Sequence, residues 1–184
     1  MVLIRDDERR FAGLIMATSD AQGLDPVLLE KDYWAVEALR AVREGFDVEI
    51  NGELVRIQPI FKGGTSLSKA FGLIERFSED VDLLVPVPFD QPDGYGQNQR
   101  NSVLKACMEA VRRALSIDGE RSAGRRGVDL HWRYLYKSIS GDPRLSGVDP
   151  AIRVEVTVMG GANPSSRRSV TSMVADHVGT VEGF

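Results

Sequence analysis

Residues 62–83, KGGTSLSKAFGLIERFSEDVDL, contain the features that decide how this chain folds. The glycines at 63 and 64 interrupt an apolar run, which predicts the end of a strand and a helix that begins at Thr65. Polar and apolar residues alternate over 80–83, as they do in a strand. This stretch therefore predicts a strand, a Gly-Gly turn, a helix and a second strand.

Helices and strands continue to alternate outward from this stretch. Asp25 followed by Pro26 is a helix start signal, and Cys107 lies on the apolar face of a later helix, where it is expected to fill the core. Helices are expected at about 5–18, 26–44 and 98–115, and strands at 54–61, 80–85, 128–137 and 151–160. This order predicts an α+β fold (α/β, mixed sheet), with helices packed on a small mixed β-sheet.

Length and composition indicate one globular domain over residues 1–184, with a helical part at about 1–50 and a core at about 51–160. The net charge of −4 argues against a protein that binds nucleic acid through a basic surface covering the whole molecule. One cysteine excludes an internal disulfide. No apolar run reaches the roughly 20 residues that span a bilayer, and no secretory signal is present, so we expect a soluble cytoplasmic protein.

Asp80 and Asp82 are the clearest candidates for chemistry. Residues two apart in a strand project from the same face, so both carboxylates point to one place and repel each other unless a cation lies between them. Hard oxygen ligands of this kind suit Mg²⁺ or Mn²⁺. An isolated Asp-x-Asp pair is also compatible with a solvated strand face.

The Gly-Gly turn adds a candidate phosphate site. Gly63 and Gly64 bring backbone amides to a helix N-terminus, a combination suited to phosphate. The spacing is neither that of a P-loop nor that of a Rossmann turn. Thr65 and Ser66 are suited either to capping this helix or to donating hydroxyl groups to phosphate.

Taken together, the string KGGTSLSKAFGLIERFSEDVDL resembles the signature of the AbiEii/AbiGii toxin branch of the polymerase-beta-like nucleotidyltransferase superfamily. That signature pairs Lys-Gly-Gly-Thr-x-Leu with Arg-x-Ser-x-Asp-Ile/Val-Asp-Leu. The upstream EKDYW at 30–34 is similar to the family's amino-terminal helix. The resemblance is close over about residues 25–85 and looser beyond them.

The resemblance implies a nucleotidyltransferase fold and assigns roles to individual residues. Asp80 and Asp82 would bind metal, and Glu155, on the polar face of a later strand, would be the third catalytic carboxylate. The residues that would bind the nucleotide are Gly63, Gly64, Thr65, Ser66, Lys69, Arg76 and Ser78. For Lys69 and Arg76, an ordinary surface position is the alternative, and for Glu155 it is simple solvent exposure.

The implied reaction is magnesium-dependent transfer of a nucleoside monophosphate from an NTP to an acceptor by the toxin of a toxin–antitoxin or phage-defence system. The implied acceptor is RNA, such as the 3′ end of tRNA, and the implied partner is a cognate antitoxin. Residues 100–144 carry ten Lys/Arg and five Asp/Glu, a net +5, against −9 elsewhere. If RNA binds, this segment would form a basic edge that contacts it, with residues 121–127 as a basic loop. The alternative is that its charges are simply exposed to solvent.

Two other functions fit parts of the sequence. A non-catalytic nucleotide- or partner-binding module would keep the fold without the reaction, but would not need all three carboxylates. A glycosyltransferase would use the Asp-x-Asp pair for a nucleotide sugar and metal, but this leaves the Gly-Gly turn unexplained. The family also usually continues into a helical carboxy-terminal region, so the chain is expected to be either a truncated or a minimal member.

Overall fold

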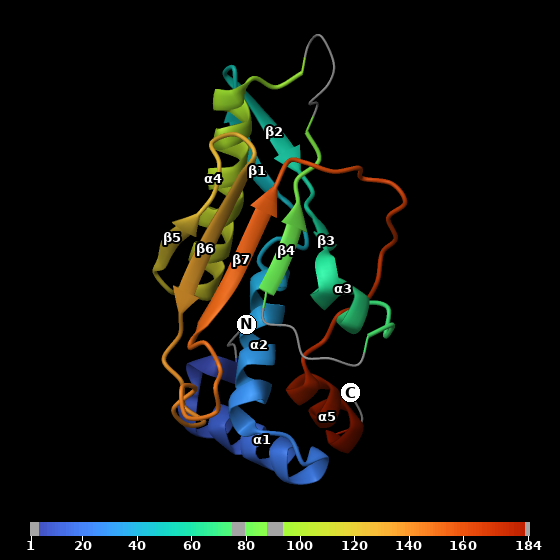
Figure 1. The fold of residues 1–184 in the computed structure, drawn as a ribbon. Helices are drawn as coiled ribbons and strands as arrows, with labels where there is room; N and C mark the ends of the chain where they lie inside the picture. Colours follow the sequence, from blue (N-terminus) through green and yellow to red (C-terminus); the bar gives the residue numbers. More distant parts are fainter. Residues whose placement is uncertain (1–3, 75–79, 88–93, 183–184) are drawn as a thin grey trace.

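The computed structural model describes residues 4–74, 80–87 and 94–182, and shows a twisted sheet backed by helices (Figure 1). The sheet has the strand order β3-β4-β7-β6-β5. Its strands are β3 (Ile60–Lys62), β4 (Asp80–Leu84), β5 (Gly119–Ala123), β6 (Asp129–Leu135) and β7 (Ala151–Thr157). β4 and β7 are parallel, whereas the other neighbouring pairs are antiparallel, so the expected α+β fold with a mixed sheet is confirmed.

A separate hairpin and six helical segments complete the described chain. β1 (Phe46–Ile50) and β2 (Glu53–Ile57) form the two-stranded antiparallel hairpin. The helical segments are η1 (Ile4–Asp6), α1 (Glu8–Gln22), α2 (Pro26–Arg40), α3 (Gly63–Lys69), α4 (Gln97–Leu115) and α5 (Met173–Glu182). In the described ranges, none of these helices combines the length and the apolarity needed to cross a membrane.

One face of the main sheet forms the core. α2 contacts β4 and β7, and α4 contacts β6 and β7, so these two helices cover the same face. The side chains that meet them are almost fully buried and include Val81, Leu83, Val154 and Val156. Burying each contributes about 1.5–3 kcal/mol. The alternation of each strand then leaves the polar residues on the opposite face.

The central helix α2 buries charged residues as well as apolar ones. Glu30, Lys31 and Asp32, from the EKDYW segment, are at most 1% exposed. Glu30 accepts hydrogen bonds from Ser138 Oγ and from the backbone amides of residues 139 and 140, and Lys31 Nζ donates to the carbonyl of Asp149. These bonds offset the cost of burying charge, and they fix the 138–149 loop against the helix.

The strands and helices depart from the sequence expectations in a few places. The run 54–61 is not one strand, because Pro59 lies between β2, which joins the hairpin, and β3, which joins the main sheet. The helix expected at Thr65 begins at Gly63. The expected basic loop 121–127 belongs in its first three residues to the edge strand β5, whose exposed polar residues carry no alternating apolar signal. β1 and α5 are further elements that the sequence patterns do not predict.

Replacing Glu30 with alanine should destabilise the fold by about 3 kcal/mol, because the half-buried donors of residues 138–140 would lose their buried acceptor. Thermal and urea unfolding measure this loss. The control is Glu8→Ala, which removes an exposed ion pair with Lys137 and should cost at most about 1 kcal/mol. Equal losses in the two variants would contradict the structural role of Glu30.

Candidate active site

The expected carboxylate pair lies on the open face of β4. Asp80 and Asp82 alternate with Val81 and Leu83, which are 0% and 1% exposed on the core side. Since α2 and α4 cover the core side, the two aspartates project away from them. The apolar alternation of this strand therefore determines where the carboxylates point.

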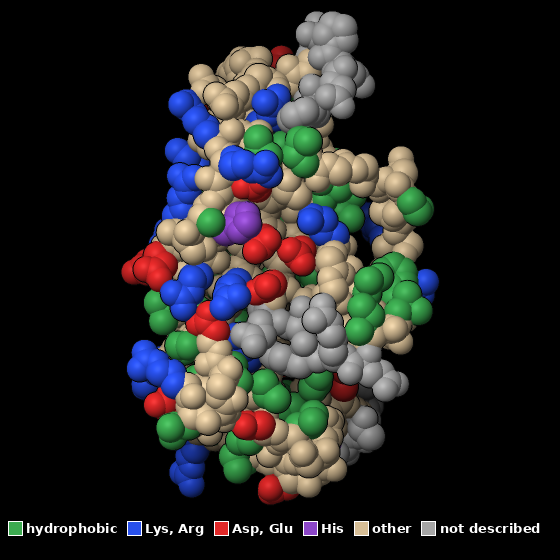
Figure 2. Space-filling model, viewed as in Figure 1, with side chains coloured by type: hydrophobic (Ala, Val, Ile, Leu, Met, Phe, Trp, Pro, Cys, Tyr) green, Lys and Arg blue, Asp and Glu red, His purple; other side chains and the backbone are tan. Residues whose placement is uncertain are grey.

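Strand pairing brings Glu155 to the same place. In the parallel pairing of β4 with β7, Asp82 lies opposite Glu155, and in the antiparallel pairing with β3 it lies opposite Lys62. The three predicted catalytic carboxylates thus share one face of two adjacent strands. Figure 2 shows acidic side chains gathered beside a histidine near the middle of this face.

Gly63 is required at the edge of this cluster. Its φ is +74°, which side-chain-bearing residues rarely adopt. A Cβ added there would also lie 2.8 Å from the carboxyl carbon of Asp82. The first glycine of the Gly-Gly turn therefore lets the backbone pass directly against the Asp82 carboxylate.

Charge is concentrated around Asp82. Partial burial is the main cause that raises the pKa of Asp82, and the nearby carboxylates of Glu155 and Asp80 raise it further, whereas Lys62 and His131 oppose this rise. Ionising all three carboxylates therefore lowers the stability of the fold. A bound cation would relieve both the desolvation and the repulsion.

Two residues for which the sequence carries no functional signal, His131 and Arg153, lie beside the carboxylates. His131 lies opposite Glu155 on β6, and its Nδ1 is 3.2 Å from Glu155 Oε1. Arg153 lies opposite Asp80 on β7, with Nη1 3.8 Å from Asp80 Oδ1. Both residues fall on the polar faces of alternating strands, but only the pairing of the strands places them beside the carboxylates.

The carboxylates provide a suitable donor set for a divalent cation, although they do not form a closed site. Asp80 Oδ1 is buried and has no hydrogen-bond partner among the described residues. Three carboxylates offer the hard oxygen ligands that Mg²⁺ and Mn²⁺ prefer. Among residues 4–74, 80–87 and 94–182, no three acidic, histidine or cysteine side chains already surround one point as metal ligands do.

The predicted nucleotide-binding residues are distributed unevenly. Gly63 and Gly64 form the first turn of α3, beside Asp82. Thr65 Oγ1 donates to the carbonyl of Asp80 at 2.5 Å, and Ser66 Oγ donates to the carbonyl of Gly63 at 2.9 Å. The Thr65 hydroxyl therefore holds α3 against β4, whereas the Ser66 hydroxyl bonds within α3 itself.

Lys69 lies at the other end of α3 and faces the protein. Its Nζ is 2.5 Å from Asp32 Oδ1 and donates to the carbonyl of Thr171, so it joins α3 to α2 and to the segment before α5. Arg76 and Ser78 lie outside the described residues. Their proposed contacts with phosphate remain predictions from the sequence.

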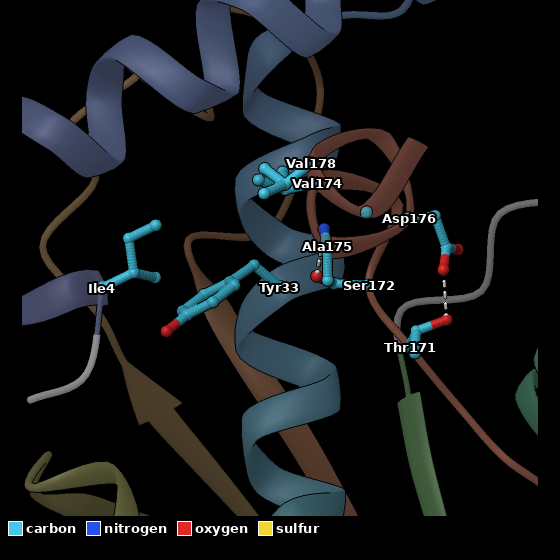
Figure 3. Close-up of a pocket in the computed structure, with 9 residues that line it drawn as sticks. Ile4, Tyr33, Thr171, Ser172, Val174, Ala175, Asp176 and Val178 are labelled. Carbon is cyan, nitrogen blue, oxygen red and sulfur yellow. Dashed lines mark hydrogen bonds between the residues drawn. The ribbon is translucent and has the colours of Figure 1, made fainter. Parts of the chain in front are cut away.

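A separate cavity of about 590 Å³ lies between α2, η1 and α5, away from the carboxylates. Tyr33, Val174 and Val178 line it, as Figure 3 shows. At its rim, Thr171 Oγ1 donates to Asp176 Oδ1, and the amide of residue 175 donates to Ser172 Oγ. These bonds cap the start of α5, so the side chains of Thr171, Ser172 and Asp176 stabilise that end of the helix.

Comparison with known families identifies the class of protein that this site defines. A family model described as the nucleotidyl transferase AbiEii toxin of type IV toxin–antitoxin systems matches residues 53–182, which include Gly63, Asp80, Asp82 and Glu155. The chain belongs to the AbiEii nucleotidyltransferase toxin family. The expected family is therefore confirmed.

The chain was also compared with individual curated proteins and with solved structures. Curated protein sequences gave no match. Among solved structures, the chain is similar to MenT4, a nucleotidyltransferase toxin from Mycobacterium tuberculosis H37Rv, with 18% identity and a TM-score of 0.47. The match covers 94% of this chain and 51% of MenT4, so this chain spans about half the length of that protein.

Replacing Gly63 with alanine should displace the Asp82 carboxylate and strain the backbone by about 1–2 kcal/mol. The variant should melt at a lower temperature and lose most of any stabilisation that Mg²⁺ gives the wild type in thermal unfolding. The control is Gly13→Ala in α1, which has open space around the added Cβ and should be neutral or stabilising. A Gly63 variant that retains the full Mg²⁺ response would contradict this role.

Replacing Asp82 with asparagine should raise the melting temperature in EDTA near neutral pH, because a costly ionised group becomes neutral. Each kcal/mol gained corresponds to roughly 2–4 °C for a chain of this size. Since the pKa of Asp82 is raised in the folded state, its destabilising effect grows as pH rises and disappears as pH falls. The advantage of the variant should therefore shrink in acid; an advantage independent of pH would contradict the charge explanation.

Proposed function

We propose that this chain is the catalytic part of a toxin that transfers a nucleoside monophosphate from an NTP to an RNA acceptor, such as the 3′ end of tRNA. The reaction would depend on Mg²⁺ or Mn²⁺ and would take place in the cytoplasm. A cognate antitoxin would oppose it, in keeping with the type IV toxin–antitoxin systems in the description of the family.

The observation that carries this proposal is the position of Asp82. It is paired in register with Glu155, lies two residues from Asp80 on the same strand, and touches the Gly63 turn. Three carboxylates beside a glycine turn suit a metal-bound triphosphate better than the carboxylates or the turn would alone.

In this reaction, the acceptor hydroxyl gives its proton to water and its oxygen bonds to the α-phosphorus of the NTP. The bond from that phosphorus to the oxygen bridging the α- and β-phosphates breaks, and pyrophosphate leaves. Divalent cations held by Asp80, Asp82 and Glu155 would neutralise charge on the phosphate oxygens and lower the pKa of the attacking hydroxyl. Gly63 and Gly64 would bind the triphosphate. Lys62, which lies opposite Asp82 on the neighbouring strand, would bind a phosphate oxygen through its positive charge.

Purified protein incubated with each labelled NTP, Mg²⁺ or Mn²⁺ and total RNA should transfer label to RNA. Asp80→Asn and Asp82→Asn should lower this transfer by on the order of 10³-fold, because cation binding contributes several kcal/mol to the transition state. Asp118→Asn is the matched control, since that side chain is fully exposed. Equal activity in all three variants would overturn the assigned site.

The alternative is a module with the same fold that binds nucleotides or a partner without transfer. It is favoured if NTPs bind in a metal-dependent manner while no label reaches any RNA. Isothermal titration with the four NTPs, run beside the transfer assay, separates the two functions.

A further inference from the structure

We propose that the buried ion pair between Asp32 and Lys69 positions the Gly63 turn beside the Asp82 carboxylate, so that Lys69 acts on NTP binding without touching the nucleotide. This inference rests on the proposed function, because it concerns the turn that would bind the triphosphate there. It gives Lys69 a positioning role in place of the phosphate contact that its charge suggests.

The helix that carries the turn is short and gains little from apolar packing. α3 lies against β3 and β4 (Figure 1) and has seven residues, whereas helices shorter than roughly 12–15 residues are marginal on their own. Its buried residues are the polar Thr65 and Ser66, and its one leucine, Leu67, is 40% exposed. Hydrophobic burial therefore contributes little to the position of α3, and polar contacts fix it.

These polar contacts hold α3 at both ends. At its start, Thr65 Oγ1 donates to the carbonyl of Asp80 on β4. At its end, Lys69 Nζ lies 2.5 Å from Asp32 Oδ1 on α2 and donates to the carbonyl of Thr171 at 3.2 Å. Because α2 also contacts β4, both anchors refer α3 to the strand that carries the catalytic aspartates.

Burial makes the ion pair specific. The side chains of Asp32 and Lys69 are 1% and 14% exposed. Asp32 Oδ2 accepts from the amide of Met173 at 2.8 Å, but its Oδ1 accepts no well-aligned hydrogen bond from the described residues. The Lys69 ammonium therefore compensates the charge on Oδ1. A displacement of α3 away from α2 would leave a buried carboxylate without its cation, which is costly.

The same contacts make Lys69 unsuited to bind phosphate directly. Its charge is matched by Asp32, and one of its donors is used by the carbonyl of Thr171. It also lies about 9 Å along the helix axis from Gly63, at 1.5 Å per residue. Its effect on a nucleotide at the turn must therefore pass through α3.

The Gly63 turn is sensitive to the position of α3. Gly63 is the first residue of that helix, and a Cβ added to it would lie 2.8 Å from the carboxyl carbon of Asp82. Since backbone and carboxylate are packed this closely, a tilt of α3 moves the turn relative to Asp82. Loss of the ion pair would thus displace the groups expected to meet the phosphates, while the carboxylates stay on β4.

Three variants separate positioning from stability. Lys69→Met leaves Asp32 without its cation, so it should lower the melting temperature. It should also raise the Kd for NTP with Mg²⁺, measured by calorimetry, about tenfold, as expected for one lost hydrogen bond to a charged group. Combining Asp32→Asn with Lys69→Met removes both charges and should restore most of the melting temperature, but not the NTP affinity. Lys69→Arg keeps the charge and should recover part of that affinity.

The transfer assay adds a second measurement. The double variant should raise the KM for NTP about tenfold and leave kcat at saturating NTP within about twofold of the wild type. The matched control is Lys137→Met, which removes an exposed lysine paired with Glu8 and should change neither value. A double variant that regains NTP affinity together with stability would overturn the inference, since Lys69 would then serve only to balance charge.

Hydrogen exchange tests the positioning without any nucleotide and separates this inference from the proposed function. In the double variant, the amides of residues 63–70 should exchange faster by on the order of tenfold, while those of α2 keep the wild-type rate. Unchanged exchange over 63–70 would contradict the positioning role.

The outcomes for the two proposals differ. If the wild type binds NTP but transfers no nucleotide, the transfer function fails and the binding data decide the role of Lys69. If it binds no NTP, the proposed function fails and hydrogen exchange alone decides whether the ion pair positions the turn. If transfer occurs and the double variant keeps the wild-type KM for NTP, the transfer function stands and the positioning role fails.

Discussion

The parallel pairing of β4 with β7 is the constraint on which the site depends. It aligns Asp82 with Glu155 and Asp80 with Arg153, and the β3 and β6 pairings then add Lys62 and His131 at either side. The core makes this register specific, because Val81, Leu83, Val154 and Val156 must all face α2 and α4. A slip by one residue would bury the carboxylates and expose the valines.

The open face carries alternating charges that limit the cost of this alignment. Lys62 and His131 lie beside the acidic row, while Arg153 lies between Asp80 and Asp149. Even so, the pKa of Asp82 is raised, so these neighbours do not fully compensate for burial and repulsion. The site thus keeps an electrostatic cost that a cation would relieve.

The buried charges of α2 place the outer parts of the molecule around this sheet. Glu30 and Lys31 bind the 138–149 loop, which contains Asp149, and Asp32 binds both Lys69 of α3 and the amide at the start of α5. The EKDYW segment, which resembles the family's amino-terminal helix, therefore joins α2 to the 138–149 loop, to α3 and to α5. It also holds Asp149, whose carboxylate accepts hydrogen bonds from Arg133 on β6 and Arg153 on β7.

Local signals in the sequence were enough for the mixed α+β fold, the α2 start at Asp25, the buried Cys107 and the common face of Asp80 and Asp82. They were not enough for β5, because a short exposed edge strand carries little hydrophobic periodicity. They were not enough for α5, because its Gly179 and its β-branched valines and threonine are weak helix formers. Lys69 illustrates the same limit: its charge suggested phosphate, but its partner Asp32 lies on a helix distant in sequence.

By itself, the sequence determined which residues alternate, where glycine was needed and which family the chain belongs to, since these depend on neighbours along the chain. Only the tertiary structure decided which strands pair and in what register. That choice depends on packing between distant segments, and it placed Glu155 beside Asp82, His131 beside Glu155 and Arg133 beside Arg153.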